Sequence, residues 1–398
     1  MSVFGNHGFN FDSLLRTGGG IKDVLLRGVL MSKNLKVAIA CGGTGGHIFP
    51  GLATGGELLA RGCEVTLWLA GKDIEGDAVK GWSGRIVTIQ AEGFQFGFSW
   101  RSVKTIFRLH KAYRMALKEM RKDPPDVLLA MGSYASFGPV RAARKLGVPY
   151  VLHEANLVPG RAISWLLPKA TAVAASFEKS RFYLKHNRLI ITGMPLRQVL
   201  REASLKVDRE CCSVKPLRVL VMGGSRGAQA LNETVPEALV LTAEKGLSIE
   251  VNHIAGLQDS KTIEALYKKA GIKAKVYHFV QEMEKMYPSI DLAICRSGAA
   301  TCAELAAFGV PALLIPYPFA IRNHQMSNAR ALQDIGAADV VAQEDLSASW
   351  LCDYLINVSE NPERLKRMVA AMRKRAQPNA TALLADLLEE VGREGTKK

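Results

Sequence analysis

The segment Cys41–Gly51 combines closely spaced glycines with Thr44 and His47, directly after the apolar run Lys36–Ala40. A short apolar run, then glycines, then a segment with helical spacing of leucines is typical of the first strand, loop and helix of a doubly wound sheet. Glycines let the backbone approach a ligand closely, and a helix start offers N–H groups to an anion. His47 lies at the tip of this turn, where a titratable side chain could reach a substrate.

Three further loops follow apolar runs in the same way. Gly132–Ser136 follows the run Val127–Ala130, Gly223–Ser225 follows a second run, and Cys295–Glu304 follows a third. In open α/β sheets, the edge where strands end and helices begin carries the ligands. The four loops, two in each half of the chain, indicate a cleft between two domains that holds a phosphate-bearing ligand.

The glycine spacing disfavours two common nucleotide-binding motifs. A dinucleotide fingerprint needs G-x-G-x-x-G and an acidic residue at the end of the second strand. Counted from Gly43, the third glycine position is occupied by Ile48, and Asp73 is only a weak candidate for the acid. The chain has neither a G-x-x-x-x-G-K-[ST] motif nor a D-x-D metal motif. We therefore expect neither a nicotinamide enzyme nor a P-loop NTPase, and neither a metal nor any other cofactor.

Two later segments carry side chains that suit sugar hydroxyls. Glu304 is expected about one turn into a helix, where its carboxylate could accept two hydrogen bonds from a ribose, although a simple interaction with the helix dipole explains it equally well. In the segment Pro316–Ala329, two prolines fix a rigid loop that amide and imidazole side chains follow, among them Gln325. A capped and solvated helix start is an equally good explanation of that segment.

Short apolar runs, which we predict to be strands, alternate with helical segments along most of the chain. In the first half they comprise residues 36–40, 64–70, 85–90, 127–130, 150–152, 172–175 and 189–192. After a charged stretch, residues 201–215, the pattern restarts with runs at 217–222, 249–253, 275–279, 292–295, 312–315 and 339–341. This alternation predicts parallel sheets covered by helices on both faces. We therefore predict two Rossmann-like, doubly wound domains, each opening with a strand, a glycine loop and a helix.

Composition limits the class of protein. The chain has 398 residues, more than one domain usually holds, and a net charge of +15, which implies an anionic partner such as nucleic acid, acidic lipid or a phosphorylated substrate. No apolar run is long enough to span a bilayer, and residues 1–33 lack the apolar core of a signal peptide. The seven cysteines include no C-x-x-C pair, so we expect reduced thiols in a cytosolic protein.

Six segments in a fixed order carry a resemblance to a known family. They are Gly42–Ala53, His153–Asn156, Gly193–Arg197, Gly223–Ala228, Cys295–Glu304 and His324–Ala329. Together they resemble the MurG family, the UDP-N-acetylglucosamine transferases that convert lipid I to lipid II in peptidoglycan synthesis. The resemblance runs from about Val37 to the last helices, and the ordered set is specific although no single segment is.

The resemblance implies an inverting glycosyltransferase of the GT-B fold, with two domains facing across a cleft. We expect residues 1–33 to be a disordered extension and residues 34–197 to form an acceptor and membrane domain. Residues 198–376 would form the UDP-sugar donor domain, and the C-terminal helices, about residues 377–395, would pack back on the first domain. The acceptor would be the C4 hydroxyl of the N-acetylmuramyl sugar of undecaprenyl-linked lipid I. The protein would then lie at the cytoplasmic face of the inner cell membrane.

The resemblance also implies which residues contact UDP-N-acetylglucosamine. Arg197 and the backbone near Val280 would serve the uracil, and Glu304 the ribose. Ser225 and the helix start at Ala299–Thr301 would hold the diphosphate, and Gln325 the sugar hydroxyls. The full expected set is Thr44, Gly45, Gly46, Asn156, Arg197, Ser225, Val280, Ala299, Ala300, Thr301, Cys302, Ala303, Glu304 and Gln325.

The first-domain loops would face the lipid diphosphate acceptor and the reacting centre. Thr44, Gly45, Gly46 and His47 belong to one of these loops, and Gly132 and Tyr134 to another. Breaking the sugar–phosphate bond leaves negative charge on UDP, which helix N-termini and loop N–H groups can stabilise in place of a metal. A general base must remove the proton of the acceptor hydroxyl, and His47 is our candidate.

Some positions depart from the usual pattern of the family. Ser133 stands where a second glycine is common, and Arg226 where glutamine is common. Ile321 and Arg322 occupy positions where an acidic residue often precedes the polar helix start. The first two changes leave backbone roles possible, whereas Arg322 puts the local contacts to the donor sugar in question.

The segment Phe94–Lys122 combines aromatic residues with a strong positive charge. Phe96, Phe98 and Trp100 precede a stretch that is rich in lysine and arginine. Aromatic side chains beside a basic amphipathic helix suit the surface of an anionic bilayer, where a lipid-linked acceptor would be presented. An ordinary solvated helix with one buried face remains the alternative.

Other functions are compatible with parts of this pattern. Another GT-B enzyme, such as a glycolipid glycosyltransferase or a UDP-sugar epimerase, would share the second-domain motifs but differ in the first-domain glycine loops. A non-catalytic nucleotide- or nucleic-acid-binding protein is compatible with the basic charge. No nucleic-acid-binding motif supports that class, so we expect no nucleic-acid partner.

Overall fold

The computed structural model describes residues 34–71, 73–89, 100–207, 216–224, 227–258 and 260–395. The predicted N-terminal extension, residues 1–33, lies outside them. All the elements below belong to one compact unit, Leu35–Lys398. Among the described residues, every helix is too short or too polar to cross a membrane.

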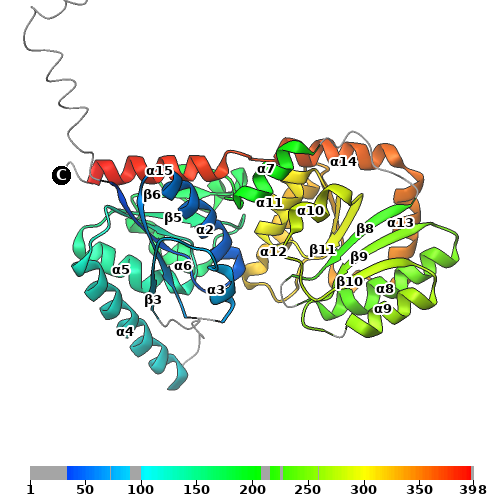
Figure 1. Ribbon diagram of the computed structural model, residues 1–398, viewed down its shortest axis with the longest axis horizontal. Helices are drawn as coiled ribbons and strands as arrows, with labels where there is room; N and C mark the ends of the chain where they lie inside the picture. The colour runs from blue at the N-terminus through cyan, green and yellow to red at the C-terminus, as the bar shows by residue number, and fades with distance from the viewer. Residues whose placement is uncertain are drawn as a thin grey trace, which may run out of the picture. The chain divides into compact units, whose positions relative to one another are not determined.

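The first half of the described chain, coloured blue to green in Figure 1, forms a parallel sheet of seven strands. Their order is β3-β2-β1-β4-β5-β6-β7. The order reverses between β1 and β4, so the loops after these two strands flank the point where doubly wound sheets bind ligands. The strands are β1 (Lys36–Ala40), β2 (Glu64–Leu69), β3 (Arg85–Thr88), β4 (Val127–Ala130), β5 (Tyr150–Glu154), β6 (Ala172–Ala175) and β7 (Leu189–Ile191).

Alternation along β1 divides the first core into two layers. Val37 and Ile39 face one cluster, whereas Ala38 and Ala40 face the other. The first layer holds α2 (Gly45–Ala60) and α15 (Ala380–Gly395), with α3 (Asp73–Ala78) beside α2. The second layer holds α4 (Trp100–Lys122), α5 (Phe137–Leu146) and α6 (Arg161–Leu166).

The second half repeats the design with six parallel strands in the order β10-β9-β8-β11-β12-β13. Here the order reverses between β8 and β11, which places the loops after those strands at the ligand-binding edge. The strands are β8 (Leu217–Met222), β9 (Ile249–Ile254), β10 (Lys273–Tyr277), β11 (Leu292–Cys295), β12 (Ala312–Leu314) and β13 (Ala338–Val340).

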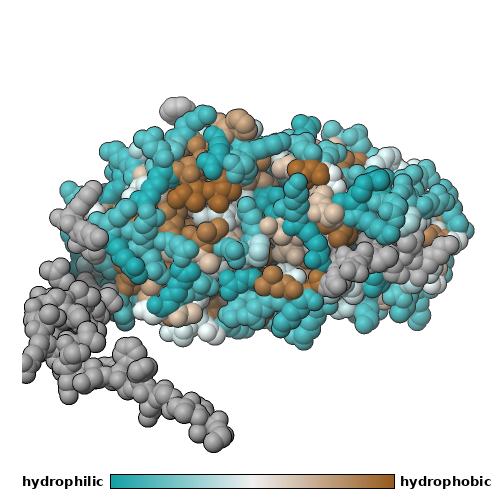
Figure 2. Space-filling view, turned by 90° about the horizontal axis from the view of Figure 1, so that it is seen from above, coloured by the Kyte–Doolittle hydropathy of each residue, from teal (hydrophilic) through white to brown (hydrophobic). Residues whose placement is uncertain are grey.

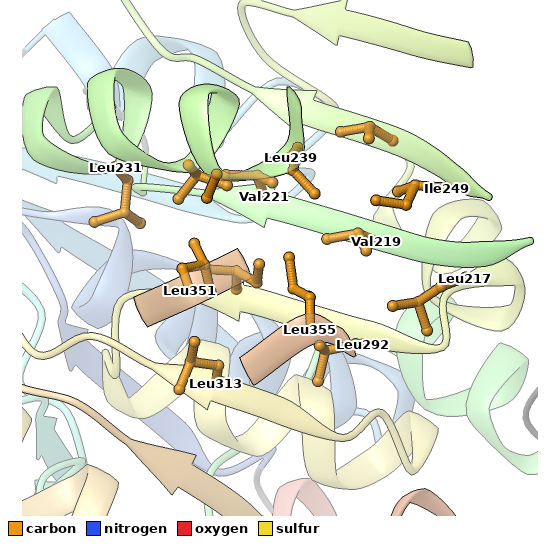
Figure 3. Packing of buried hydrophobic residues seen from close by; sticks show 14 of the residues in the cluster. Leu217, Val219, Val221, Leu231, Leu239, Ile249, Leu292, Leu313, Leu351 and Leu355 are labelled. Carbon is orange, nitrogen blue, oxygen red and sulfur yellow. The ribbon is translucent and has the colours of Figure 1, made fainter. Parts of the chain in front are cut away.

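Helices cover both faces of this second sheet. One face packs against α8 (Gln229–Glu244), α9 (Ser260–Lys269), α13 (Ala348–Glu360) and α14 (Pro362–Arg375). The other packs against α7 (Gln198–Lys206), α10 (Met283–Met286), α11 (Ala299–Phe308) and α12 (His324–Gln333). Figure 3 shows leucines of α8 and α13 gathered around Val219 and Val221 of β8. Full burial of each such side chain stabilises the fold by roughly 1.5–3 kcal/mol.

The predicted doubly wound α/β fold is confirmed; several strand ends differ by one or two residues, and one strand is shifted by two residues at both ends. We expected the third strand of the second half at residues 275–279, but β10 spans Lys273–Tyr277. Lys273 pairs with Glu250 of β9 and Tyr277 with Ile254. β10 is an edge strand whose residues are only partly covered, so its pairing continues through charged side chains that an apolar pattern does not reveal.

The last helix, α15, lies beside α2 and β4 of the first sheet, so the C-terminal end of the chain completes the core of the N-terminal half (Figure 1). Leu384, Leu387 and Leu388 contribute to that core and are at most 3% exposed. Arg61 of α2 pairs with Asp386 at 2.6 Å across the contact. The exact division of the chain into domains at residues 197 and 376 stays a prediction.

The face seen in Figure 2 is mostly hydrophilic, with hydrophobic residues gathered in small patches. Several large apolar side chains are nevertheless exposed, among them Phe107 on α4 at 72% and Trp165 on α6 at 52%. Scattered exposed apolar residues are common in soluble proteins, but apolar side chains that gather beside basic ones mark surfaces of interaction.

Candidate active site

The loop between β1 and α2 has a backbone that glycine alone can follow. Gly43 adopts a φ of 120°, which L side chains rarely adopt. A side chain on Gly42 would come within 2.4 Å of the backbone nitrogen of Ala70. Thr44 precedes the first turn of α2 in an extended conformation, and its hydroxyl makes no hydrogen bond to the helix backbone. The Thr44 side chain therefore does not occupy the N–H groups at this helix start, although His47 N–H and Ile48 N–H bond to the Thr44 carbonyl oxygen.

His47 is held by its neighbour in this turn. Its Nδ1 lies 2.9 Å from the Thr44 hydroxyl oxygen. When the ring proton is on Nδ1 and donated to Thr44, Nε2 is the basic nitrogen. Burial lowers the pKa of His47 to about 4, and repulsion from the imidazoles of His153 and His324 adds to the shift. The imidazole is consequently neutral at pH 7, the state that a general base requires.

The loop after β4 packs against this first loop. Ser133 donates a hydrogen bond of 2.5 Å to the carbonyl oxygen of Gly42, and it accepts one from Ala135 N–H. A side chain built on Gly43 would lie 3.4 Å from the Tyr134 hydroxyl, so Tyr134 is a direct neighbour of the glycine turn. The expected acceptor residues Gly132 and Tyr134 thus lie beside the loop that carries His47. Ser133, where the family often has glycine, links the two loops.

The segment after β5 is organised by a buried carboxylate. Glu154 is 3% exposed and accepts hydrogen bonds from the N–H groups of Asn156 and Gly160, both at 2.8 Å. Burial raises the pKa of Glu154 to about 7, although these bonds oppose the shift. The carboxylate fixes a tight loop and orients Asn156, whose side-chain oxygen accepts a bond of 3.1 Å from Asn328 of α12.

His153, at the end of β5, has one ring nitrogen with a partner and one without. Its Nε2 bonds to the carbonyl oxygen of Gly193 at 3.1 Å. Its Nδ1 is buried and has no hydrogen-bond partner among the described residues. Burial lowers the pKa of His153 to about 4, so the ring is neutral at pH 7. With the proton on Nε2, Nδ1 is an acceptor only.

Three ionisable side chains come together beside the middle of α11. The Tyr287 hydroxyl donates a hydrogen bond of 2.7 Å to Glu304. The pKa of Glu304 is raised by burial, whereas the Tyr287 bond and the positive charge of Arg197 oppose the rise. Arg197, just before α7, lies over the ring of Phe49, with 5.4 Å between its guanidinium carbon and the ring centroid. The structure thus brings together Arg197 and Glu304, which are far apart in sequence.

The start of α11 offers main-chain groups and small side chains. Gly298 precedes the helix in an extended conformation, and no acidic residue lies in the first turn. Ala300 and Thr301 are half-buried, whereas Ala299 and Cys302 are buried. Burial raises the pKa of the Cys302 thiol to about 12, so the thiol stays protonated in the core. A diphosphate here would be bound by backbone N–H groups and the Thr301 hydroxyl.

The loop before α12 is backbone-strained. Arg322 and Asn323 both have positive φ, 54° and 52°, which costs of order 1–3 kcal/mol for each residue without a glycine. The Arg322 guanidinium donates hydrogen bonds of 3.2 Å to Pro159 O and to Ser164 Oγ. Arg322 therefore contacts the loop that follows β5. At the start of α12, the side-chain oxygen of Gln325 accepts a hydrogen bond of 3.0 Å from Tyr317 N–H.

Comparisons with known proteins agree with this arrangement. Residues 37–175 match the model of the glycosyltransferase family 28 N-terminal domain, and residues 218–384 match that of the C-terminal domain. A UDP-N-acetylglucosamine–N-acetylmuramyl-(pentapeptide) pyrophosphoryl-undecaprenol N-acetylglucosamine transferase of Bordetella petrii is 38% identical over 90% of this chain and 98% of its own. The protein of the same name from Geobacter sulfurreducens is 34% identical over 88% and 97%.

A crystal structure of Acinetobacter baumannii MurG is 31% identical, with a TM-score of 0.74, and covers 89% of this chain and 99% of that one. The chain belongs to the MurG family. It is therefore a glycosyltransferase with the GT-B fold, as the motifs predicted. A putative UDP-N-acetylglucosamine 2-epimerase from Listeria monocytogenes shares the fold, with a TM-score of 0.65, at only 12% identity. The fold alone therefore does not separate a MurG protein from an epimerase, whereas the sequence does.

Part of the predicted MurG site lies outside the described residues. This applies to Ser225, Arg226, Phe96 and Phe98, and to the side chain of Trp100, whose backbone begins α4. Val280 is half-buried and lines a cavity of about 400 Å³ beside β9 and β10. The roles of all these residues stay predictions.

Three residues near the site were missed by the sequence reasoning. Tyr287 is the direct partner of Glu304. Glu284, one turn before Tyr287, raises the pKa of Glu304 through its negative charge, and its Oε2 is buried with no hydrogen-bond partner in the described part of the chain. Glu75 lies under the first glycine loop. The only available signal was for Glu75, because an acidic residue after the second strand is part of the dinucleotide pattern, in which we weighed Asp73 instead.

Proposed function

We propose that this protein transfers N-acetylglucosamine from UDP-N-acetylglucosamine to the C4 hydroxyl of the N-acetylmuramyl sugar of lipid I. The product would be lipid II, a precursor of peptidoglycan. The observation that carries the proposal is the 38% identity to a transferase of that name over 90% of this chain. The pairing of a neutral histidine in one half with an Arg–Glu–Tyr cluster in the other is consistent with acceptor and donor sites of this reaction.

In this proposal the donor binds to the second half. Glu304 accepts hydrogen bonds from the ribose hydroxyls, and Tyr287 holds its carboxylate in place from the other side. Arg197 contacts the uracil, and the N–H groups at the start of α11 bind the diphosphate. As the bond between the sugar and the phosphate breaks, negative charge develops on UDP, and these N–H groups stabilise that charge without having to reorganise.

The acceptor reacts from the first half. The neutral His47 takes the proton of the acceptor hydroxyl as the oxygen attacks the anomeric carbon, and the sugar–phosphate bond breaks on the opposite side. The anomeric configuration is therefore inverted. His47 is held in its turn by Thr44. Its replacement by alanine removes the proposed general base and should lower kcat by about 10²–10⁴-fold, the range typical of such a loss. Unchanged turnover in His47→Ala, with donor binding intact, would contradict this role.

We propose further that the reaction needs no metal. Charge stabilisation by helix N-termini and loop N–H groups takes the place that a divalent ion occupies in metal-dependent transferases. Activity should therefore persist in an excess of EDTA. A loss of activity on chelation that Mg²⁺ or Mn²⁺ restores would contradict this expectation.

The decisive experiment measures transfer of radiolabelled N-acetylglucosamine to a lipid I analogue, with UDP-glucose as competitor. We expect a labelled lipid product that UDP-glucose does not suppress at equal concentration. The epimerase alternative predicts conversion of UDP-N-acetylglucosamine with no acceptor present. The nucleic-acid-binding alternative predicts salt-sensitive binding to random DNA and no affinity for the UDP-sugar.

We also propose that the first half rests on an anionic membrane as a peripheral protein, at the cytoplasmic face of the inner membrane. A shallow cavity on α4 of about 510 Å³ is lined by Phe107 and Met115 together with basic side chains. A larger cavity, of about 920 Å³, has aromatic and basic residues in its lining, including Trp165, Arg144 and Lys169. Aromatic and basic side chains together suit the interface of an anionic bilayer.

Flotation with liposomes that contain anionic lipid tests the membrane proposal. The wild type should float and the Phe107→Ala/Trp165→Ala double variant should float less, as should the Phe96/Phe98/Trp100 triple alanine variant. The Leu257→Ala variant is a matched control, since Leu257 is 83% exposed in the other half of the chain. Equal flotation of wild type and both alanine variants would contradict the proposal.

A further inference from the structure

A buried carboxylate ties together the ends of the first two strands. Glu75 belongs to a short polar helix, α3, yet its side chain is buried and only 2% exposed. Its Oε1 accepts hydrogen bonds from Gly43 N–H at 2.8 Å and Ala70 N–H at 3.2 Å. Its Oε2 accepts one of 2.6 Å from Gly71 N–H. Gly43 follows β1, whereas Ala70 and Gly71 follow β2.

The geometry calls for a carboxylate and for no other side chain of that size. All three partners are N–H donors, and a carboxylate is the side chain that only accepts. A glutamine would turn its NH₂ group toward at least one N–H group and leave a buried donor without an acceptor, at a cost of about 1–3 kcal/mol. Bonds from N–H groups to a charged acceptor are also roughly twice as strong as neutral ones.

These bonds determine the path of the glycine loop. The N–H group of Gly43 points at Glu75 and is therefore not available to a ligand. The next residue is Thr44, whose hydroxyl lies 2.9 Å from His47 Nδ1. A continuous series of contacts thus runs from the carboxylate through the loop backbone to the imidazole. The acid after β2, which would bind a ribose in a dinucleotide site, here holds the loop itself.

We propose that Glu75 is a positioning residue for the acceptor half of the active site. It fixes Gly43, and through Gly43 and Thr44 it sets the place and orientation of the His47 imidazole. It acts through other residues and touches no substrate. This inference rests on the proposed transferase function, in which His47 is the base.

The test compares Glu75→Gln with the wild type in the transfer assay. We expect kcat to fall at least tenfold and the KM for UDP-N-acetylglucosamine to stay within twofold, because the contacts proposed for the uracil, the ribose and the diphosphate lie away from this loop, at Arg197, Glu304 and the start of α11. Glu75→Asp keeps the charge and should recover part of the lost kcat. Glu178→Gln, which changes a glutamate with a 72% exposed side chain in the same half, should match the wild type.

Several outcomes would overturn the proposal. They are a wild-type kcat in folded Glu75→Gln, or a rise in donor KM as large as the fall in kcat, which would indicate general damage. Should Glu75→Gln not fold, Gly43→Ala serves instead, because a side chain there meets no atom closer than 3.4 Å but opposes the φ of 120°. Gly43→Ala should show the same selective loss of kcat, and a wild-type kcat would overturn the proposal.

A readout that does not depend on turnover separates this proposal from the proposed function. The NMR signals of the His47 imidazole should shift between wild type and Glu75→Asp or Glu75→Gln, and should not shift in Glu178→Gln. A wild type that transfers no sugar would refute the function, while the shifted His47 signals would still support the link from Glu75 to His47. Unshifted signals would overturn that link even in an active enzyme.

Discussion

At the scale of single residues, the proposed base is unusual because its environment favours the neutral form so strongly. Burial and two neighbouring imidazoles, those of His153 and His324, lower the pKa of His47 to about 4. A base with a low pKa is a weaker proton acceptor, but it is fully unprotonated at neutral pH. Burial, with a smaller contribution from the neighbouring imidazoles, thus keeps His47 ready to accept a proton across the whole physiological range.

The pH dependence of kcat/KM follows from this shift. The base works when it is unprotonated, so activity should stay level from pH 8 to pH 5.5 and fall only as the pH approaches about 4. A histidine with the ordinary pKa of about 6.5 would lose roughly tenfold by pH 5.5. Values of kcat/KM from rates at substrate concentrations well below KM, measured on protein that circular dichroism shows to be folded, distinguish the two. A tenfold loss by pH 5.5 would show that the pKa of His47 in the free enzyme is not lowered to about 4.

A second residue-scale prediction concerns the ribose contact. Glu304→Ala should raise the KM for UDP-N-acetylglucosamine by ten- to a hundredfold, because about 1.5–3 kcal/mol of hydrogen bonding to a charged group is lost. Tyr287→Phe leaves the carboxylate but removes the 2.7 Å bond that orients it, so its effect should be smaller and in the same direction. Equal KM values for wild type and Glu304→Ala would remove Glu304 from the donor site.

At the scale of elements, the loops work because each is fixed by the end of a strand and the start of a helix. The glycine turn before α2 is tied to β2 by Glu75 and to the loop after β4 by Ser133. The loop after β5 is tied to α12 through Asn156 and Asn328. The side chains that we propose to act in catalysis therefore lie on loops with few degrees of freedom, as pre-organised catalysis requires.

The C-terminal helix α15 gives an element-scale prediction. Leu388 is fully buried against the first sheet, so Leu388→Ala should lower the free energy of unfolding by 2–5 kcal/mol. Leu383 lies on the same helix and is 44% exposed, so Leu383→Ala should change it by less than about 1 kcal/mol. Urea unfolding of both variants checks this. Similar losses in the two would mean that α15 does not cover the sheet in solution.

At the scale of the whole molecule, buried ionisable groups in both halves couple folding to pH. Burial lowers the pKa of His153 in the first half and of His253 in the second to about 4. Both are fully buried, and His253 bonds to the Tyr267 hydroxyl at 2.8 Å. Burial raises the pKa of Glu154 to about 7, so this carboxyl acts in the opposite direction.

Each of these buried groups changes the free energy of unfolding with pH in a direction set by its pKa shift. A histidine whose pKa in the folded protein is below 6.5 binds a proton more readily in the unfolded chain. The free energy of unfolding therefore decreases as the pH falls from 6.5 to 4, by about 3 kcal/mol for each such histidine. The cost of burying Glu154 is present above pH 7 and disappears as pH falls to 4.5. We therefore expect a net loss of about 3 kcal/mol or more between pH 6.5 and 4. Urea unfolding across this range measures it, and a constant free energy of unfolding would contradict the burial of both histidines.

Patterns local in sequence predicted much of this molecule. Alternating apolar runs and helical segments gave the two doubly wound sheets, because strand and helix periodicities are written into neighbouring residues. The ordered set of glycine loops gave the family, and the comparisons bear this out. The boundary of β10 was missed because an edge strand is only partly buried and its pairing is decided by β9, a separate segment of chain.

The sequence alone thus determined the fold class and the family, and it predicted the loops to which we assign the chemistry. Only the tertiary structure decided which side chains act together there. Glu75 meets Gly43 across 32 residues, and Tyr287 meets Glu304 across 17. Whether a carboxylate is buried, what it bonds and where its pKa lies depend on neighbours in space. A periodic pattern describes one element at a time, whereas the partners and the pKa of a buried ionisable group depend on every element that packs around it.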